Sequence, residues 1–110
     1  MFNHKTIAWY RRLNRALDPV TKEMLRACFA RRLQIRERLA DLHRRHKDVS
    51  VEMGRLRVES LSDIEAYVEL AVKERAKYAL QREIDRLDSE ERAIEQTRLR
   101  FVVDPEQDGQ

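Results

Sequence analysis

Two histidines, His43 and His46, form the pattern in this sequence that comes nearest to a metal site. Their spacing places both imidazoles on one face of a helix. Arg44 and Arg45 lie between them, so a bound cation would meet positive charge and too few ligands. We therefore expect no metal here, and we interpret His46 as a polar position in a helix–helix contact that helps to fix its register.

Patterns typical of catalysis are missing from the sequence. Adjacent acids such as Glu90 and Glu91 would point to solvent from a long helix and would not form an acid–base pair. The sequence has no glycine-rich phosphate loop, zinc-ligand spacing or nucleophile elbow. The lone Cys28 is interpreted as a buried structural thiol. We expect a protein that is not an enzyme and that uses no cofactor.

The composition of the 110 residues favours long helices. Charged residues make up 39%, and the chain has two glycines and two prolines, too few for the turns of a sheet protein. No apolar run is long enough to span a bilayer, and the N-terminus lacks the apolar core of a secretory signal. Together with the single cysteine, these features predict an all-α protein located in the cytoplasm.

Charge is unevenly divided along the chain. Residues 1–57 hold 15 Lys and Arg against 6 Asp and Glu, whereas residues 58–110 hold 8 against 14, giving +9 and −6. Two explanations compete: the halves lie against each other, or the basic half faces an acidic partner such as nucleic acid.

A first long helix is predicted over residues 19–57. Asp18 supplies an N-cap, and Pro19 stands at the first helical position. The apolar positions then follow alternating steps of three and four, the heptad spacing of a coiled-coil seam. That seam consists of Leu25, Cys28, Ile35, Leu39, Leu42, His46, Val49, Met53 and Leu56, with Arg32 as a polar interruption. Gly54 leaves an alternative, a small β-hairpin over residues 49–58, but we favour continuous helix because the heptad runs through it.

A second long helix is predicted over residues 62–101, after a reversal at residues 58–61. Ser62 and Glu65 match a capping box, in which the serine hydroxyl accepts from the N–H of Glu65. The apolar stripe of this helix follows steps near 3.6 at first and 3-4 spacing only after Leu80. Its predicted seam is Ile64, Val68, Val72, Leu80, Ile84, Leu87, Ile94 and Phe101.

Two arms of similar length joined by a short turn predict an antiparallel coiled-coil helical hairpin over residues 18–102. Residues 1–17 are expected to form a short basic amphipathic helix, and residues 103–110 a disordered polar tail. A two-helix hairpin of this size is marginally stable by itself, so assembly into a larger bundle is expected.

Apolar residues away from the two seams have no place to pack in a single hairpin. We expect them to bind a second copy of the chain or another protein, together with an aromatic and basic cluster near the N-terminus. The candidate partner-binding residues are Trp9, Tyr10, Arg11, Arg12, Phe29, Leu33, Tyr67, Leu70 and Tyr78. For the N-terminal cluster the competing interpretation is packing within the chain.

A nucleic-acid-binding regulator is the alternative function. Arginine can contact phosphate groups in a bidentate manner, and this chain is rich in it. The arginines that would form such a surface are Arg11, Arg12, Arg15, Arg31, Arg36, Arg38, Arg44 and Arg45.

The stretch SDIEAYVEL, residues 62–70, resembles the descending helix of the FliJ/YscO family, coiled-coil stalk proteins of flagellar and type III secretion export. The resemblance covers roughly residues 19–101 and implies a hairpin that acts in the pore of a hexameric export ATPase. The stretch MGRLRV, residues 53–58, is also similar to the β-prefoldin family, which would imply a subunit of a hexameric chaperone. The segment IAWYRRLNRAL, residues 7–17, departs from the stalk pattern.

Overall fold

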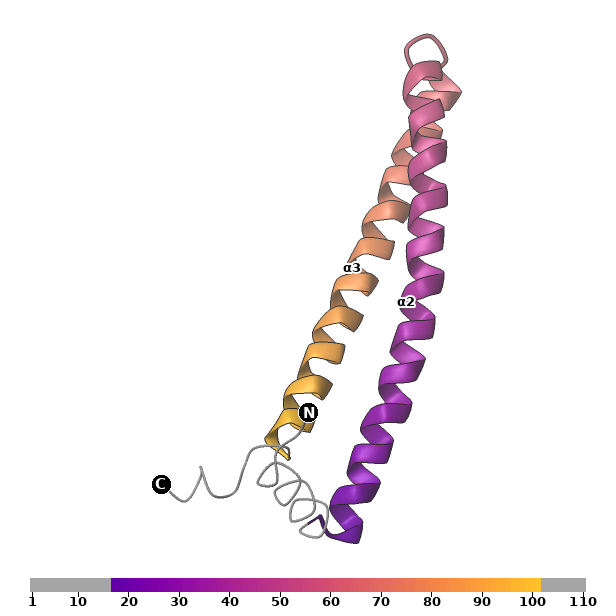
Figure 1. Cartoon of the computed structure of the whole chain (residues 1–110). Coiled ribbons are helices and arrows are strands. Elements are labelled where there is room, and N and C mark those ends of the chain that lie inside the picture. Colours follow the sequence, from indigo (N-terminus) through magenta and orange to yellow (C-terminus); the bar gives the residue numbers. More distant parts are fainter. Residues whose placement is uncertain (1–16, 102–110) are drawn as a thin grey trace, which may run out of the picture. The chain divides into compact units, whose positions relative to one another are not determined.

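A computed structural model describes residues 17–101, which form two long helices joined by a short turn (Figure 1). Helix α2 covers Pro19–Glu59 and helix α3 covers Ile64–Arg100. The predicted all-α helical hairpin is confirmed, with arms at 19–59 and 64–100 instead of 19–57 and 62–101. The predicted N-terminal helix, apart from Leu17, and the predicted polar tail lie outside the described residues.

Helix α2 begins as the sequence predicts. The Oδ1 atom of Asp18 accepts a hydrogen bond from the backbone N–H of Thr21 at 2.6 Å, and Pro19 is the first helical residue. That bond from Thr21 lowers the pKa of the Asp18 carboxyl, because it stabilises the ionised form.

Gly54 lies in the interior of α2, so the alternative β-hairpin over residues 49–58 does not form. Nothing lies within 4 Å of the point where a Cβ atom at Gly54 would stand. The position therefore has an ordinary helical backbone with open space beside it, and a larger residue would fit.

Helix α3 is capped by Asp63 and not by Ser62. The Oδ1 atom of Asp63 accepts from the backbone N–H of Glu65 at 2.9 Å, and the helix begins at Ile64. The predicted capping box at Ser62 is therefore wrong. A carboxylate beside the positively polarised end of a helix is a stronger acceptor than a hydroxyl group, which explains why the helix starts after the aspartate.

Contacts divide the described residues into two units, each containing a segment of both helices. The turn unit comprises residues 34–91, and the terminal unit comprises residues 17–33 and 92–101. All the buried side chains among the described residues belong to the turn unit: Ile35, Leu42, Met53, Leu56, Ala66, Ile84 and Leu87.

Ion pairs between the helices of the turn unit show that the helices are antiparallel, because a residue earlier in α2 pairs with a residue later in α3. Arg36 Nε lies 3.8 Å from Glu91 Oε2, and within this outer pair Lys73 Nζ lies 2.9 Å from Glu52 Oε2. The first pair joins the basic half of the chain to the acidic half, and the second has the opposite polarity. The expectation that the two halves lie side by side is therefore met in this unit.

The α2 side of the contact in the turn unit follows the predicted heptad. Ile35, Leu42, Met53 and Leu56 are buried. The other predicted seam positions, Leu39, His46 and Val49, are half-buried. Regular alternation of three and four residues therefore identified the α2 side of the contact correctly.

The α3 side differs from the prediction near the turn. Ile64, Val68 and Val72 are 75%, 53% and 60% exposed, so their placement in the seam is wrong. The side chains that contact α2 there come from another face of α3. They are Ala66, which is buried, and Leu70, Lys73 and Lys77, which are half-buried. These positions continue to Leu80, Ile84 and Leu87 in steps of four and three, so α3 keeps a heptad throughout this unit.

The terminal unit has a looser contact. Its predicted seam residues Leu25, Cys28, Ile94 and Phe101 are all half-buried, and none of its described side chains is fully buried. The apolar contact in this unit is thus weaker per residue than in the turn unit.

Candidate interaction surface

A row of exposed apolar side chains on α3 is the most prominent surface feature of the turn unit. Ile64, Val68 and Val72 recur every four residues, and Tyr67 and Tyr78 flank them at 66% and 68% exposure. We call these five residues the outer face. Because a helix turns about 100° per residue, Ile64 stands roughly 200° from Ala66, which faces α2. The row of Ile64, Val68 and Val72 is therefore on the side of α3 that points away from the helix contact, whereas Tyr78 reaches the edge of that contact.

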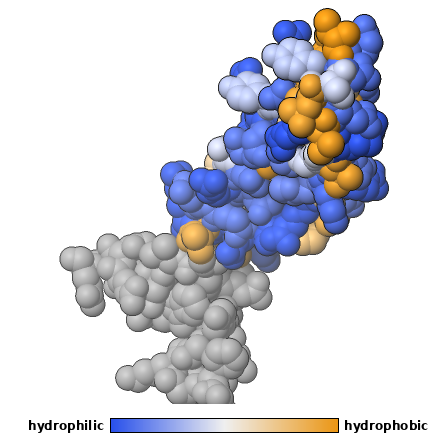
Figure 2. Space-filling view, turned by 90° about the horizontal axis from the view of Figure 1, so that it is seen from above, coloured by the Kyte–Doolittle hydropathy of each residue, from blue (hydrophilic) through white to orange (hydrophobic). Residues whose placement is uncertain are grey.

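Figure 2 looks down on the turn and shows hydrophobic side chains gathered in a strip, with hydrophilic surface on both sides. Leu61 in the turn and Val58 at the end of α2 add to the exposed apolar area at 86% and 70%. Contiguous apolar patches with a polar rim mark sites where proteins bind other molecules, whereas single exposed residues do not.

Tyr78 also lines an open cavity of about 310 Å³ at the edge of the helix contact. The guanidinium of Arg82 lies over the Tyr78 ring at 6.0 Å from its centroid, near the outer limit of a cation–π contact. His46 lines the same cavity. The other lining residues are Met53, Glu74, Lys77 and Gln81.

The predicted partner-binding residues that the structure describes fall into two groups, one in each unit. Tyr67 and Tyr78 lie on the outer face, but Leu70 is half-buried in the contact with α2, so its assignment as an off-seam residue is wrong. Phe29 and Leu33 are exposed in the terminal unit, at 66% and 49%. Trp9, Tyr10, Arg11 and Arg12 lie outside the described residues.

Sequence reasoning missed Ile64, Val68 and Val72 as surface residues. It assigned this row to the seam because these residues are more hydrophobic than Ala66, Lys73 and Lys77. The signal that could have separated the two faces is the 3-4 spacing, which extends backwards from Leu80 through the lysines without a break.

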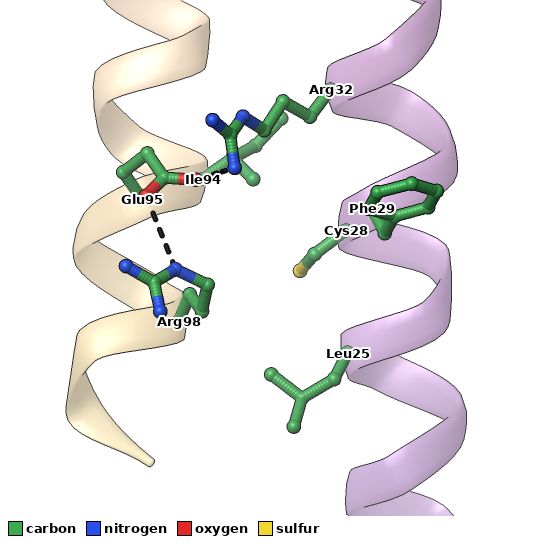
Figure 3. A pocket seen from close by; sticks show the side chains of 7 residues that line it. All are labelled: Leu25, Cys28, Phe29, Arg32, Ile94, Glu95 and Arg98. Atoms are coloured by element: carbon green, nitrogen blue, oxygen red, sulfur yellow. Dashed lines mark hydrogen bonds and ion pairs between the residues drawn. The ribbon is translucent and has the colours of Figure 1, made fainter. Parts of the chain in front are cut away.

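A second cavity, of about 250 Å³, lies between the two helices of the terminal unit (Figure 3). Leu25 and Cys28 point from α2 toward α3 there, and Phe29 also lines the cavity. Glu95 lies between two arginines: Arg32 Nη1 is 3.1 Å from its Oε1, and Arg98 Nε is 3.1 Å from its Oε2. Two guanidinium groups face one carboxylate, so this end of the cavity keeps a net positive charge, and the remaining lining residues are apolar.

Arginines of α2 that could form a nucleic-acid surface are engaged with carboxylates. Asp41 pairs with Arg38 at 3.4 Å, with Arg45 at 3.0 Å and with Arg44. Arg38 also reaches across to Glu83 of α3 at 3.1 Å. Phosphate groups would have to compete with these acids, so the described part of this surface is less favourable for nucleic acid than its arginine count indicates.

In the contact between α2 and α3, the pKa values of Glu52 and Lys73 are shifted because the two side chains bind each other. A hydrogen bond from Lys73 lowers the pKa of the Glu52 carboxyl, and the same bond raises the pKa of the Lys73 ammonium. Among the described residues no cluster of three or more His, Cys, Asp or Glu could hold a metal ion. None of their helices is both long and apolar enough to cross a membrane.

Comparisons of the chain with protein-family models, with curated proteins and with solved structures gave no match.

Proposed function

We propose that this protein is a non-catalytic interaction module that binds a protein partner through the outer face of α3. The observation that carries the proposal is the exposure of Ile64, Val68 and Val72, which form one apolar row opposite the helix contact. Leaving such a row in water has a free-energy cost, and burial against an apolar partner removes it. The flanking tyrosines supply large side chains of the kind that dominate protein interfaces.

Stability supports the same proposal. A hairpin of two helices has one contact between its arms, and the terminal unit contributes no fully buried side chain to it. Covering the outer face would give α3 a second apolar contact and would stabilise the folded state by mass action.

Within this class of function, a stalk or adaptor role in an export apparatus is the role that the resemblance to the FliJ/YscO family implies. A chaperone subunit is the role that the similarity to the β-prefoldin family implies. Both remain predictions, and both share with our proposal a helical hairpin that works by contact and not by catalysis.

A photo-crosslinking amino acid at position 68 tests the proposal in the native cells. We expect adducts of defined mass when it replaces Val68, and none when it replaces Glu37, an exposed residue of α2. Circular dichroism of both purified variants checks that the helices are intact. Absence of adducts at position 68, or equal adducts at both positions, would refute the outer face as the binding surface.

A further inference from the structure

Helix α3 carries a second heptad on the side away from α2. Two residues before each position in the contact with α2, from Ala66 to Ile84, stands a residue that is exposed. Positions two apart on a helix are separated by about 200° of rotation, so these exposed residues lie on the opposite side of α3. They follow steps of four, three, four, three and four, and we call them the second seam: Ile64, Val68, Ala71, Arg75, Tyr78 and Arg82.

The spacing of the second seam indicates what kind of structure can cover it. Alternating steps of three and four residues keep one side of a helix in contact with another helix along its whole length. The same alternation marks the side of α3 that meets α2. A partner of the second seam is therefore an α-helix that runs along α3, and residues 64–82 give it about 28 Å of helix to pack against.

Arg75 stands in the middle of the second seam and has no acidic residue one helical turn away. The residues three and four positions from it along the helix are uncharged: Ala71, Val72, Tyr78 and Ala79. Arg55 shows the more usual arrangement, because its Nη1 atom lies 3.0 Å from a carboxylate oxygen of Glu59 one turn further on. Among the described residues no ion pair joins Arg75 or Arg82 to a carboxylate, and the Arg82 guanidinium lies over the Tyr78 ring.

Acids lie around the second seam and not within it. At 100° per residue, the nearest ones stand about 80° to 140° from Ile64 around the helix: Glu65, Glu69, Glu74 and Glu83. Glu83 is bound to Arg38 of α2 at 3.1 Å, and Glu74 lines the cavity at the edge of the helix contact. A second copy of the chain that used the same seam would therefore offer Arg75 no carboxylate from that seam.

Covering the second seam with a helix takes the guanidinium of Arg75 out of water. A buried charge without a counter-charge is strongly unfavourable, so a wholly apolar partner would be opposed by this one residue. A carboxylate removes the conflict, because it accepts two parallel hydrogen bonds from a guanidinium group and neutralises its charge.

We propose that the partner of α3 is an amphipathic helix of a different protein, with apolar residues facing Ile64, Val68 and Ala71 and with Asp or Glu facing Arg75 and Arg82. The two arginines are one heptad apart, so the acids of the partner are also spaced by about seven residues. This inference rests on the proposed function, because it uses the same side of α3, and it specifies the chemistry of the partner.

Charge reversal at position 75 tests the inference in the crosslinking assay of the proposed function. Arg75→Glu, made in the chain with the photo-crosslinking amino acid at position 68, should lower the adduct yield about tenfold or more, because two carboxylates would then face each other. Arg75→Lys keeps the charge and should stay within about threefold of the parent chain. Lys47→Glu makes the same change of charge on the exposed surface of α2, and this matched control should leave the yield unchanged.

The position 75 variants should fold like the parent chain, because Arg75 makes no ion pair among the described residues; circular dichroism checks this. A crosslinker that replaces Ala79, between Arg75 and Arg82 in the sequence, then locates the facing segment of the partner by mass spectrometry. We expect Asp or Glu within one helical turn of the attachment point. Replacing that acid with arginine should restore the adducts of Arg75→Glu.

The possible results separate this inference from the proposed function. No adducts at position 68 of the parent chain would refute both. Adducts that persist or increase in a folded Arg75→Glu chain would refute an acidic partner helix and leave the outer face as the binding surface. Adducts with twice the mass of the chain would identify a second copy as the occupant, and they too would overturn the inference.

Discussion

Replacing Leu42 with alanine should remove a large part of the free energy that holds the two helices together. Leu42 is 0% exposed, so the substitution deletes three buried carbons at the centre of the α2 seam. Substitutions of this kind cost about 3 to 5 kcal/mol in well-packed cores. A two-helix contact can partly close the cavity, because solvent borders it, so we expect the lower end, about 3 kcal/mol.

Urea unfolding followed by helical circular dichroism measures this loss at one fixed protein concentration. With a denaturant dependence of about 1–3 kcal/mol per molar, the unfolding midpoint should fall by at least about 1 M. If the hairpin is barely stable, the cooperative transition should disappear altogether. The matched control is Leu61→Ala, the same substitution at a side chain that is 86% exposed, which should change stability by less than about 0.5 kcal/mol. Equal effects of the two substitutions would show that Leu42 does not lie in a buried helix contact.

Three further perturbations address the helices and their ion pair. Gly54→Ala should stabilise the protein by about 0.5–1 kcal/mol in urea unfolding, because position 54 is helical and open; a loss of stability would contradict this backbone. Asp63→Ala should lower the free energy of unfolding by about 1 kcal/mol, because it removes the cap of α3. Ser62→Ala should have little effect. A larger loss in Ser62→Ala than in Asp63→Ala would show that the serine caps the helix. The pKa of Glu52 is lowered below its ordinary 4.5 by the bond from Lys73, so the ion pair stabilises the fold above that pH and loses its effect as the pH falls through the lowered value. Glu52→Gln should therefore be less stable than the wild type at pH 7, with a difference that shrinks by pH 2 to 3; a difference independent of pH would refute this account.

Local rules were sufficient for much of the fold. The cap at Asp18, the heptad from Ile35 to Leu56 and the reversal before Ile64 all follow from residue types and spacing, because each depends on neighbours within a few positions. Continuous helix through Gly54 was also predicted from the unbroken heptad.

The face of α3 that meets α2 could not be decided by hydrophobicity alone. Near the turn α3 has two candidate stripes, and the more apolar one, at Ile64 and Val68, is exposed. On the stripe that meets α2, Lys73 is half-buried and its ammonium group binds Glu52 of α2 at 2.9 Å. Such a pairing between residues of different helices cannot be recognised from one helix's pattern.

The candidate site was predicted in part for the same reason. Tyr67 and Tyr78 were identified because they lie off any seam, and the structure places both on exposed surface. Leu70 was predicted to lie on the surface but is half-buried in the helix contact. Ile64, Val68 and Val72 were predicted to lie in that contact but are exposed. A sequence-based choice between two faces of one helix thus determines at once which residues are core and which can bind a partner.

All the buried side chains of the described residues lie in the turn unit, and this distribution determines which parts of the hairpin unfold first and which fold first. Residues 19–33 and 92–100 have no buried side chain among them. Their backbone amides should therefore exchange with deuterium through local fraying of the helix ends. Amides near Leu42 and Ile84, in the helix interiors of the turn unit, should exchange only through global unfolding. Contacts between α2 and α3 beside the turn join residues that are close in the sequence, so they cost the least loop-closure entropy. Refolding should therefore start at the turn and proceed toward the chain ends.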